Sequence, residues 1–409
     1  MSQDGEYTFK GLVKAAGWFI LDGTVLWSED RAADPGDHSQ LAPELTLPLT
    51  KGLHSLDVLL RVQGGEHICT WHWIKPGAIA PDSIDTTECR PPADWRTRLK
   101  TYNPVPVPVT QDYTNPGATY QSPLIPPLFG PGSYWNAPCD LDQVDPNSDA
   151  IIASLNNVRL HPVFGEGGSG IPFEVIPPNA AKVTVGFTYA DESDPGPYPL
   201  GSKPLIESGP TAENGGDAHW IGYAPDEDRI YEVFALGGSA SARTGGSGAI
   251  FDARTGQRIP GWQPGWTSAD AAGLPILPGL LRPEEVLDSG EINHALRCTV
   301  GKTQKGFVYP ATHYTHAYPA DRFPNYPPMG CRLRIKASTD ISRFSPAVQT
   351  ICRALKKYGT FVADNGSDSF IGLCGVPDAR WDDDILAELK QLHASDFEVV
   401  RMGPVTTSV

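Results

Sequence analysis

Proline recurs along this whole chain, with 40 prolines and 42 glycines among 409 residues. A proline inside a helix removes a backbone hydrogen bond and clashes with the preceding turn, so this frequency leaves room for few long helices. The apolar residues instead stand in short runs that end in Gly, Pro, Asn or Asp, which is typical of strands joined by turns. We therefore expect a mostly β protein, with an N-terminal β-sandwich and a larger β-rich α+β domain that carries a few short helices.

The first 77 residues hold a full set of predicted strands. The dipeptide Asp22-Gly23 is a strong hairpin signal, and the predicted strands cover 6–14, 18–21, 24–27, 45–49, 55–62 and 69–73. Proline then crowds residues 78–130, which predicts an extended and semi-rigid linker. The chain should thus divide into a small domain at 1–77, a linker at 78–130 and a larger domain at 131–409.

The larger domain contains one clearly marked helix, Ser345–Tyr358, in which apolar residues three and four apart form one face. It has a serine as N-cap, a proline at the first helical position and a glycine after its end (Ser345, Pro346 and Gly359). A second short helix is expected at Asp382–Leu392. Residues 265–279 combine small residues with prolines, which predicts a tightly packed and buried loop.

The net charge of −16 argues against one class of partner, because a chain without any basic block is repelled by the phosphates of nucleic acids. No run of 18 apolar residues is present, so we expect no membrane insertion. The first residues lack the basic and apolar regions of a signal peptide. Nucleotide-binding glycine motifs and metal-binding cysteine spacings are also missing, so we expect neither a cofactor nor a metal.

Two resemblances add a biological context. The order YTFKG, GWFILDGTVLW, LPLTKGLHSLDVLLRVQGG and a Trp-rich last strand resembles a PA14-type β-sandwich over about the first 75 residues. Sugar-binding members of that family use two adjacent aspartates with calcium, and no such pair stands in this segment. Residues 130–400 resemble a large domain of secreted, mainly actinobacterial proteins, through segments such as YADESDPGPYP, GSGAIFD, GWTSADAAGLPILPG and YGTFVADNGSD.

The second resemblance implies export and a polysaccharide context, but it implies no particular reaction. We therefore expect an extracellular protein. The seven cysteines are widely spaced, which fits either scattered disulfides or buried thiols. An exported chain should form at least one disulfide, and the candidates are Cys298, Cys331, Cys352 and Cys374.

Carboxylates gather in residues 187–234, between and beside predicted strands. Glycoside hydrolysis needs two carboxyl groups about 5–10 Å apart, one protonated and one ionised. If residues 218–231 form a hairpin, Asp217 and Glu232 lie on neighbouring strands, and His219 shares a face with Asp217. We predict one cleft with five candidate catalytic residues and a tryptophan that binds substrate: Asp191, Glu207, Asp217, His219 and Glu232, with Trp220.

A second group of polar residues predicts a different chemistry. If Glu291–Arg297 is helical, His294 and Arg297 lie on one face. Histidine or tyrosine as a base, with an arginine that neutralises a uronate carboxylate, is the chemistry of β-elimination, and several histidines with a carboxylate could equally bind a metal. The candidate residues for substrate binding in this group are His294, Arg297 and His313, with His316, Tyr309 and Tyr314 nearby in the sequence.

These observations predict an extracellular protein that acts on polysaccharide, first of all a glycoside hydrolase with paired carboxylates. A polysaccharide lyase that uses the His, Tyr and Arg group is the second interpretation. The third is a non-enzymatic adhesion, matrix or assembly-forming protein, which would associate with itself. A cleft lined by Asp217, Glu232 and Trp220 would favour the enzyme, and a flat surface with these residues apart would favour the structural role.

Overall fold

The computed structural model describes residues 120–407, apart from 131–132, 166–168, 209–216, 260, 262 and 316–324, together with the backbone of strands β1 to β7 before residue 120. The chain divides into two compact units, Met1–Tyr102 and Asn103–Val409. The predicted domain boundaries at residues 77 and 130 stay predictions.

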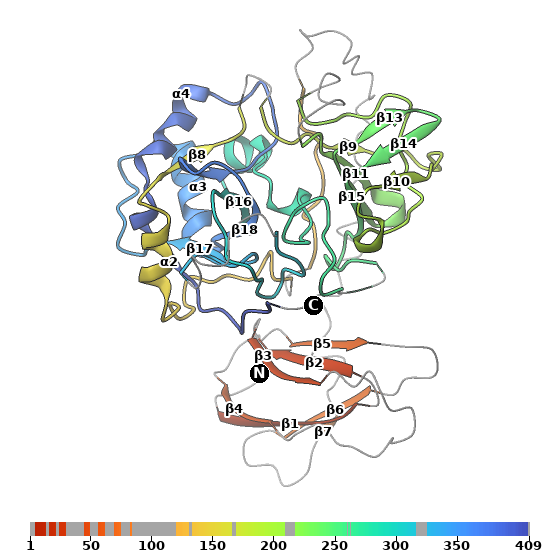
Figure 1. The fold of residues 1–409 in the computed structure, drawn as a ribbon. Helices are drawn as coiled ribbons and strands as arrows, with labels where there is room; N and C mark the ends of the chain where they lie inside the picture. The colour runs from red at the N-terminus through yellow and green to blue at the C-terminus, as the bar shows by residue number, and fades with distance from the viewer. Residues whose placement is uncertain are drawn as a thin grey trace. The chain divides into compact units, whose positions relative to one another are not determined.

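The smaller unit contains two antiparallel sheets (Figure 1). The first has the order β4-β1-β6-β7, with bounds Leu45–Leu49, Gly5–Val13, Cys69–Ile74 and Asp82–Ser83. The second has the order β3-β2-β5, with bounds Thr24–Glu29, Ala16–Leu21 and Leu56–Arg61. Six of these strands lie where alternating or apolar runs predict them, because period-two patterning is a local property of the sequence.

A mixed six-stranded sheet dominates the larger unit, in the order β20-β17-β18-β16-β19-β8. Its strands are Phe397–Val399, Arg332–Ile335, Thr360–Asn365, Leu296–Val300, Phe370–Leu373 and Arg159–Pro162. The pairs β16–β18 and β19–β8 are parallel, and the other pairs are antiparallel. The central strands β16 and β18 are mostly buried, and the apolar run Phe361–Ala363 of β18 fits a strand that is covered on both faces.

Two smaller mixed sheets complete this unit (Figure 1). The four-stranded sheet has the order β15-β12-β11-β9, with bounds Ser247–Asp252, Arg229–Phe234, Trp220–Ala224 and Glu174–Val175. The three-stranded sheet has the order β10-β14-β13, with bounds Val185–Phe187, Ala242–Gly245 and Gly237–Ser239. Strands β11 and β12 form the predicted antiparallel hairpin, in which Ile221 pairs with Glu232. The larger unit is therefore β-rich with a few short helices, as expected.

The described helices are short, and several are a single turn. They are α2 (Ser148–Ser154), α3 (Pro346–Lys357), α4 (Asp383–Leu386), η1 (Ala190–Glu192), η3 (Pro225–Glu227), η4 (Leu277–Gly279), the π-helical η5 (Glu284–Asp288), η7 (Ala387–Gln391) and η8 (Ala394–Asp396). Helix α3 contacts β17 and buries the predicted face (Figure 1). Among the described residues, no helix is long and apolar enough to cross a membrane.

Three local details differ from what the sequence predicts. Ser345 is the N-cap residue of α3 as predicted, but its hydroxyl makes no capping hydrogen bond, and its backbone N–H donates to Glu388 Oε2 at 2.7 Å. The helix predicted at Asp382–Leu392 breaks after one α-helical turn into 3₁₀ geometry. Residues 291–295 are not helical but lead directly into β16, because pairing with β18 and β19 outweighs the local pattern.

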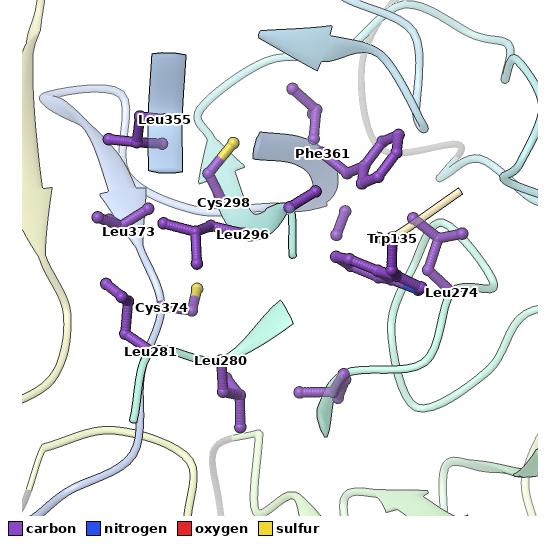
Figure 2. Packing of buried hydrophobic residues seen from close by; sticks show 14 of the residues in the cluster. Trp135, Leu274, Leu280, Leu281, Leu296, Cys298, Leu355, Phe361, Leu373 and Cys374 are labelled. Carbon is purple, nitrogen blue, oxygen red and sulfur yellow. The ribbon is translucent and has the colours of Figure 1, made fainter. Parts of the chain in front are cut away.

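The main core lies around β16, β18 and α3 (Figure 2). Trp135 packs edge-on against Phe361, with ring centroids 5.1 Å apart. The end of the predicted linker joins this core, since Leu128 and Phe129 are buried. Five buried cysteines of the larger unit are free thiols, so the disulfide expected among four of them is not formed in the structure: Cys139, Cys298, Cys331, Cys352 and Cys374.

Candidate functional site

The loop at residues 265–281, called the central loop below, runs between the four-stranded and six-stranded sheets and is almost entirely buried. The N–H groups of Ile276 and Leu277 donate to the carboxylate of Glu232 on β12, at 2.9 and 3.0 Å. On the other side, Ala272 N–H donates to the carbonyl of Ala363 on β18 at 2.8 Å. The loop is buried as predicted, and its backbone joins the two sheets.

One glycine allows the central loop to turn tightly. Gly273 has φ of +74°, and a Cβ built there would lie 1.9 Å from Thr312 Oγ1 and 2.8 Å from the carbonyl oxygen of Trp266. The same threonine donates its N–H to Ala272 at 2.9 Å, so the segment cannot move aside without losing that bond. Only glycine fits this position.

A buried ion pair forms the centre of the site. Arg297 on β16 binds the carboxylate of Asp270 on the central loop in a fork, with Nε and Nη2 at 2.8 and 2.7 Å from the two oxygens. Both side chains are almost completely excluded from solvent. Arg297 Nη1 donates to Cys374 Sγ at 2.8 Å, and Nη2 lies 3.6 Å from Asp364 Oδ2. The guanidinium is therefore fully engaged, and Asp364 at the end of β18 lies beside it.

His219 and Glu207 form the second pair of the site. The Glu207 N–H donates to the carbonyl of His219 at 2.9 Å, which holds the two residues side by side. His219 Nδ1 lies 2.6 Å from Glu207 Oε2, and Nε2 lies 3.1 Å from the carbonyl of Ala269 on the central loop. The imidazole is buried, while 22% of the Glu207 side chain is exposed.

His313 and Glu192 form a similar pair, in which the histidine again contacts a backbone carbonyl of the central loop. His313 Nδ1 lies 2.7 Å from the carbonyl of Ala271, and Nε2 lies 3.5 Å from Glu192 Oε2. Two histidines thus bind the carbonyls on either side of Asp270, and each faces a partly exposed glutamate.

The pKa values of two partly exposed carboxyl groups, Asp364 and Glu207, are shifted in opposite directions. Burial raises the pKa of Asp364 to about 7, helped by the charge of Asp270 and opposed by Arg297. Burial also acts to raise the pKa of Glu207, but the hydrogen bond and charge of His219, with the charge of Arg297, outweigh it and lower that pKa. These shifts favour a protonated Asp364 and an ionised Glu207 near neutral pH.

Glu232 is the most deeply buried carboxylate of the predicted set, with no exposed surface. Burial raises its pKa to about 7, although the N–H groups of Leu277 and Ile276 oppose this shift. Both of its oxygens face the backbone of the central loop. Glu232 therefore anchors the loop and does not line an open cleft.

Other predicted residues lie apart from this group. Asp217 and Asp191 are exposed, whereas His219 is buried, although the charge of Asp217 still acts on it. Trp220 is fully buried in a second apolar cluster, where its indole N–H binds Glu174, so it offers no surface to a sugar.

The predicted histidine and arginine group is divided by the structure. His294 Nδ1 lies 2.8 Å from the carbonyl of Ala295, and Nε2 lies 3.1 Å from Glu285, which also pairs with Arg282. Arg297 belongs to the other network, around Asp270. The two side chains therefore do not face a common point as a helix would have required.

Two residues of the site were not predicted. Asp270 stands alone among small and apolar residues in the central loop, and Asp364 follows the apolar run Phe361–Ala363 in β18. A single carboxylate within a buried segment needs a charged or hydrogen-bonding partner, and this rule could have marked both residues. The sequence could not show that Arg297 is their partner, because Arg297 lies 27 positions from Asp270 in the chain.

Among the described residues, no group of three or more His, Cys, Asp or Glu side chains is arranged to hold a metal ion. Comparison with known protein families, curated proteins and solved structures finds no match for this chain.

Proposed function

We propose that the chain is an extracellular glycoside hydrolase acting on polysaccharide, with Asp364 as proton donor and Glu207 as the ionised carboxylate. One observation carries this proposal: two partly exposed carboxyl groups beside the Asp270–Arg297 pair have pKa values that are shifted in opposite directions. Carboxyl groups whose environments separate their pKa values in this way suit an acid and a base acting together at neutral pH.

The reaction follows from these two protonation states. Asp364 gives its proton to the glycosidic oxygen as the bond to the anomeric carbon breaks. Glu207 either bonds to that carbon or takes a proton from the water that attacks it, which are the two routes of glycoside hydrolysis. The charge of Arg297 acts on both carboxyl groups, and Asp270 holds Arg297 in place through two hydrogen bonds.

This assignment replaces the pair expected from the sequence. Glu232 has no exposed surface and binds the central loop, so it cannot reach a substrate in this structure. Asp217 is exposed, so it does not share the buried environment that shifts the pKa of Glu232. Asp364 and Glu207 are more accessible, and the positive charge of Arg297 acts on the pKa of both.

The sequence resemblances support the substrate class. A PA14-like sandwich at residues 1–77 suits a module that holds the enzyme near a glycan, and the second resemblance implies export. A lyase would need Arg297 to bind a uronate carboxylate, whereas its guanidinium is buried and occupied by Asp270. The hydrolase is therefore preferred over the lyase, and the adhesion alternative is separated from both by experiment.

The test is a polysaccharide panel in which both new reducing ends and the absorbance of unsaturated products are measured. Asp364→Asn and Glu207→Gln should each lower turnover at least about a hundredfold, the lower end for a lost acid or base. The matched control is Asp368→Asn, because Asp368 follows the same strand but is exposed, with only a 3.7 Å contact to Lys302. This control should retain activity.

Three results would contradict the proposal. Unsaturated products would indicate a lyase. Glycan binding without any cleavage would favour the adhesion role. Loss of activity in Asp217→Asn, with full activity in Glu207→Gln, would return the chemistry to the pair expected from the sequence.

A further inference from the structure

The hydrogen bonds of His219 define its protonation state. Nδ1 lies 2.6 Å from a carboxylate oxygen of Glu207, and Nε2 lies 3.1 Å from the carbonyl oxygen of Ala269. Both partners are acceptors, since a backbone carbonyl has no proton and a carboxylate has none when ionised. The lowered pKa of Glu207 disfavours a protonated carboxyl that could donate to Nδ1. Beside an ionised Glu207, a neutral imidazole has one N–H and would leave one of these contacts without a proton, whereas an imidazolium donates to both.

The charges around His219 favour the same state. The charges of four carboxyl groups act on it: Glu207 beside it, Asp217 before β11, Glu232 on β12 and Asp364 on β18. The opposing cation is Arg297 on β16, which is already bound to Asp270 of the central loop. Burial acts to lower the pKa of His219, but the hydrogen bond and charge of Glu207 outweigh it and raise that pKa.

We propose that His219 is a permanently protonated positioning residue that keeps Glu207 ionised and holds its carboxylate in one orientation. This inference rests on the proposed function, in which Glu207 is the ionised carboxylate. His219 does not exchange a proton with the substrate, because both ring nitrogens are occupied and the ring is buried. It acts only through Glu207.

The central loop fixes this cation in place. The Ala269 carbonyl directs one edge of the imidazole, and the ring of Phe234 lies against it with centroids 5.7 Å apart. The loop itself is anchored by Glu232 through two backbone N–H groups. The position of His219, and with it the charge state of Glu207, therefore depends on a loop that joins the two sheets.

The first test is independent of activity. In ¹⁵N-histidine-labelled protein, the His219 signals are assigned by their loss in His219→Gln. At pH 7.5, about one unit above the ordinary histidine pKa of about 6.5, both ring nitrogens should carry protons. Removing the negative charge in Glu207→Gln should lower the pKa of His219, so that the ring titrates at lower pH. His161 is the internal control, because burial together with Lys390 and Arg159 lowers its pKa.

The second test uses the pH dependence of kcat/KM. A nearby opposite charge lowers the pKa of a carboxylate by about 1–3 units, so His219→Gln should move the acid limb upward by about that amount. A purely structural role would lower the rate without moving the limb. The control variant His161→Gln should leave the limb where it is.

The outcomes separate the two proposals. A neutral His219 ring in the wild-type protein at pH 7.5, or an acid limb unmoved in His219→Gln, overturns the positioning role even if the protein is an active hydrolase. An inactive wild-type protein on every glycan overturns the proposed function, while the ¹⁵N spectra still decide the protonation state of His219. If His219→Gln fails to fold, the His219 signals are assigned instead by their shift in Glu207→Gln, and those spectra then decide its protonation state.

Discussion

Replacing Arg297 by methionine tests whether the buried ion pair is the centre on which the site depends. Methionine keeps most of the volume but removes the charge that binds Asp270 through two hydrogen bonds of 2.8 and 2.7 Å. Asp270 would then be a buried carboxylate without a cation, close to the carboxyl groups of Asp364 and Glu232. We expect a large loss of stability for this reason.

Three independent estimates of the stability lost in Arg297→Met agree in magnitude. Hydrogen bonds to charged groups contribute about 1.5–3 kcal/mol each, so two lost bonds remove about 3–6 kcal/mol. At an effective dielectric constant of about 20, charges about 4 Å apart attract by about 4 kcal/mol. Removal of one partner from a buried ion pair generally costs about 3–5 kcal/mol. Arg297→Met should therefore lower the free energy of unfolding by about 3–5 kcal/mol.

Urea unfolding at pH 7, followed by tryptophan fluorescence and circular dichroism, measures this change. The control is Arg254→Met: Arg254 pairs with Asp252 at 3.1 Å, but 46% of its side chain is exposed, so the loss should stay below about 1 kcal/mol. Adding Asp270→Asn to Arg297→Met removes the unpaired charge and should restore part of the stability. A loss in Arg297→Met no larger than in the control, or a further loss in the double variant, would refute the reasoning.

Three further predictions concern stability and reactivity. The pKa of Glu232 is about 7 in the folded protein and about 4.3 in the unfolded chain, so its protonation stabilises the fold at low pH and this contribution disappears as the pH rises towards 7. Urea titrations of Glu232→Gln should therefore show a shallower fall in unfolding free energy between pH 5 and 7 than the wild type, by up to about 1.4 kcal/mol per pH unit. Gly273→Ala should destabilise the protein more than Gly290→Ala in the same assay, because both have positive φ but only the first meets other atoms; equal losses would contradict the clash. Burial raises the pKa of all five described thiols, Cys139, Cys298, Cys331, Cys352 and Cys374. Iodoacetamide should therefore label them only after unfolding, as located by mass spectrometry, and labelling of the native protein would count against their burial.

Several parts of the fold could be predicted from the sequence because their causes are local. The apolar stripe of α3 and the proline at its start lie within one segment, and so do the short apolar runs that become β11 and β12. The burial of the central loop follows from its small residues and prolines. Where distant pairing competes with a local pattern, prediction fails: residues 291–295 contain a helical spacing, but they continue into β16, which lies between β18 and β19.

The sequence by itself determined that the larger unit is β-rich and that a carboxylate-rich segment includes Glu207, His219 and Glu232. Only the tertiary structure decided which of these carboxyl groups reach solvent. It buried Glu232 under the central loop and brought Asp364 beside Arg297, 67 positions earlier in the chain. The physical reason is that a pKa depends on burial and on charges within a few ångströms. Such neighbours are set by the pairing of strands and loops far apart in sequence, whereas strand and helix patterns depend on adjacent residues.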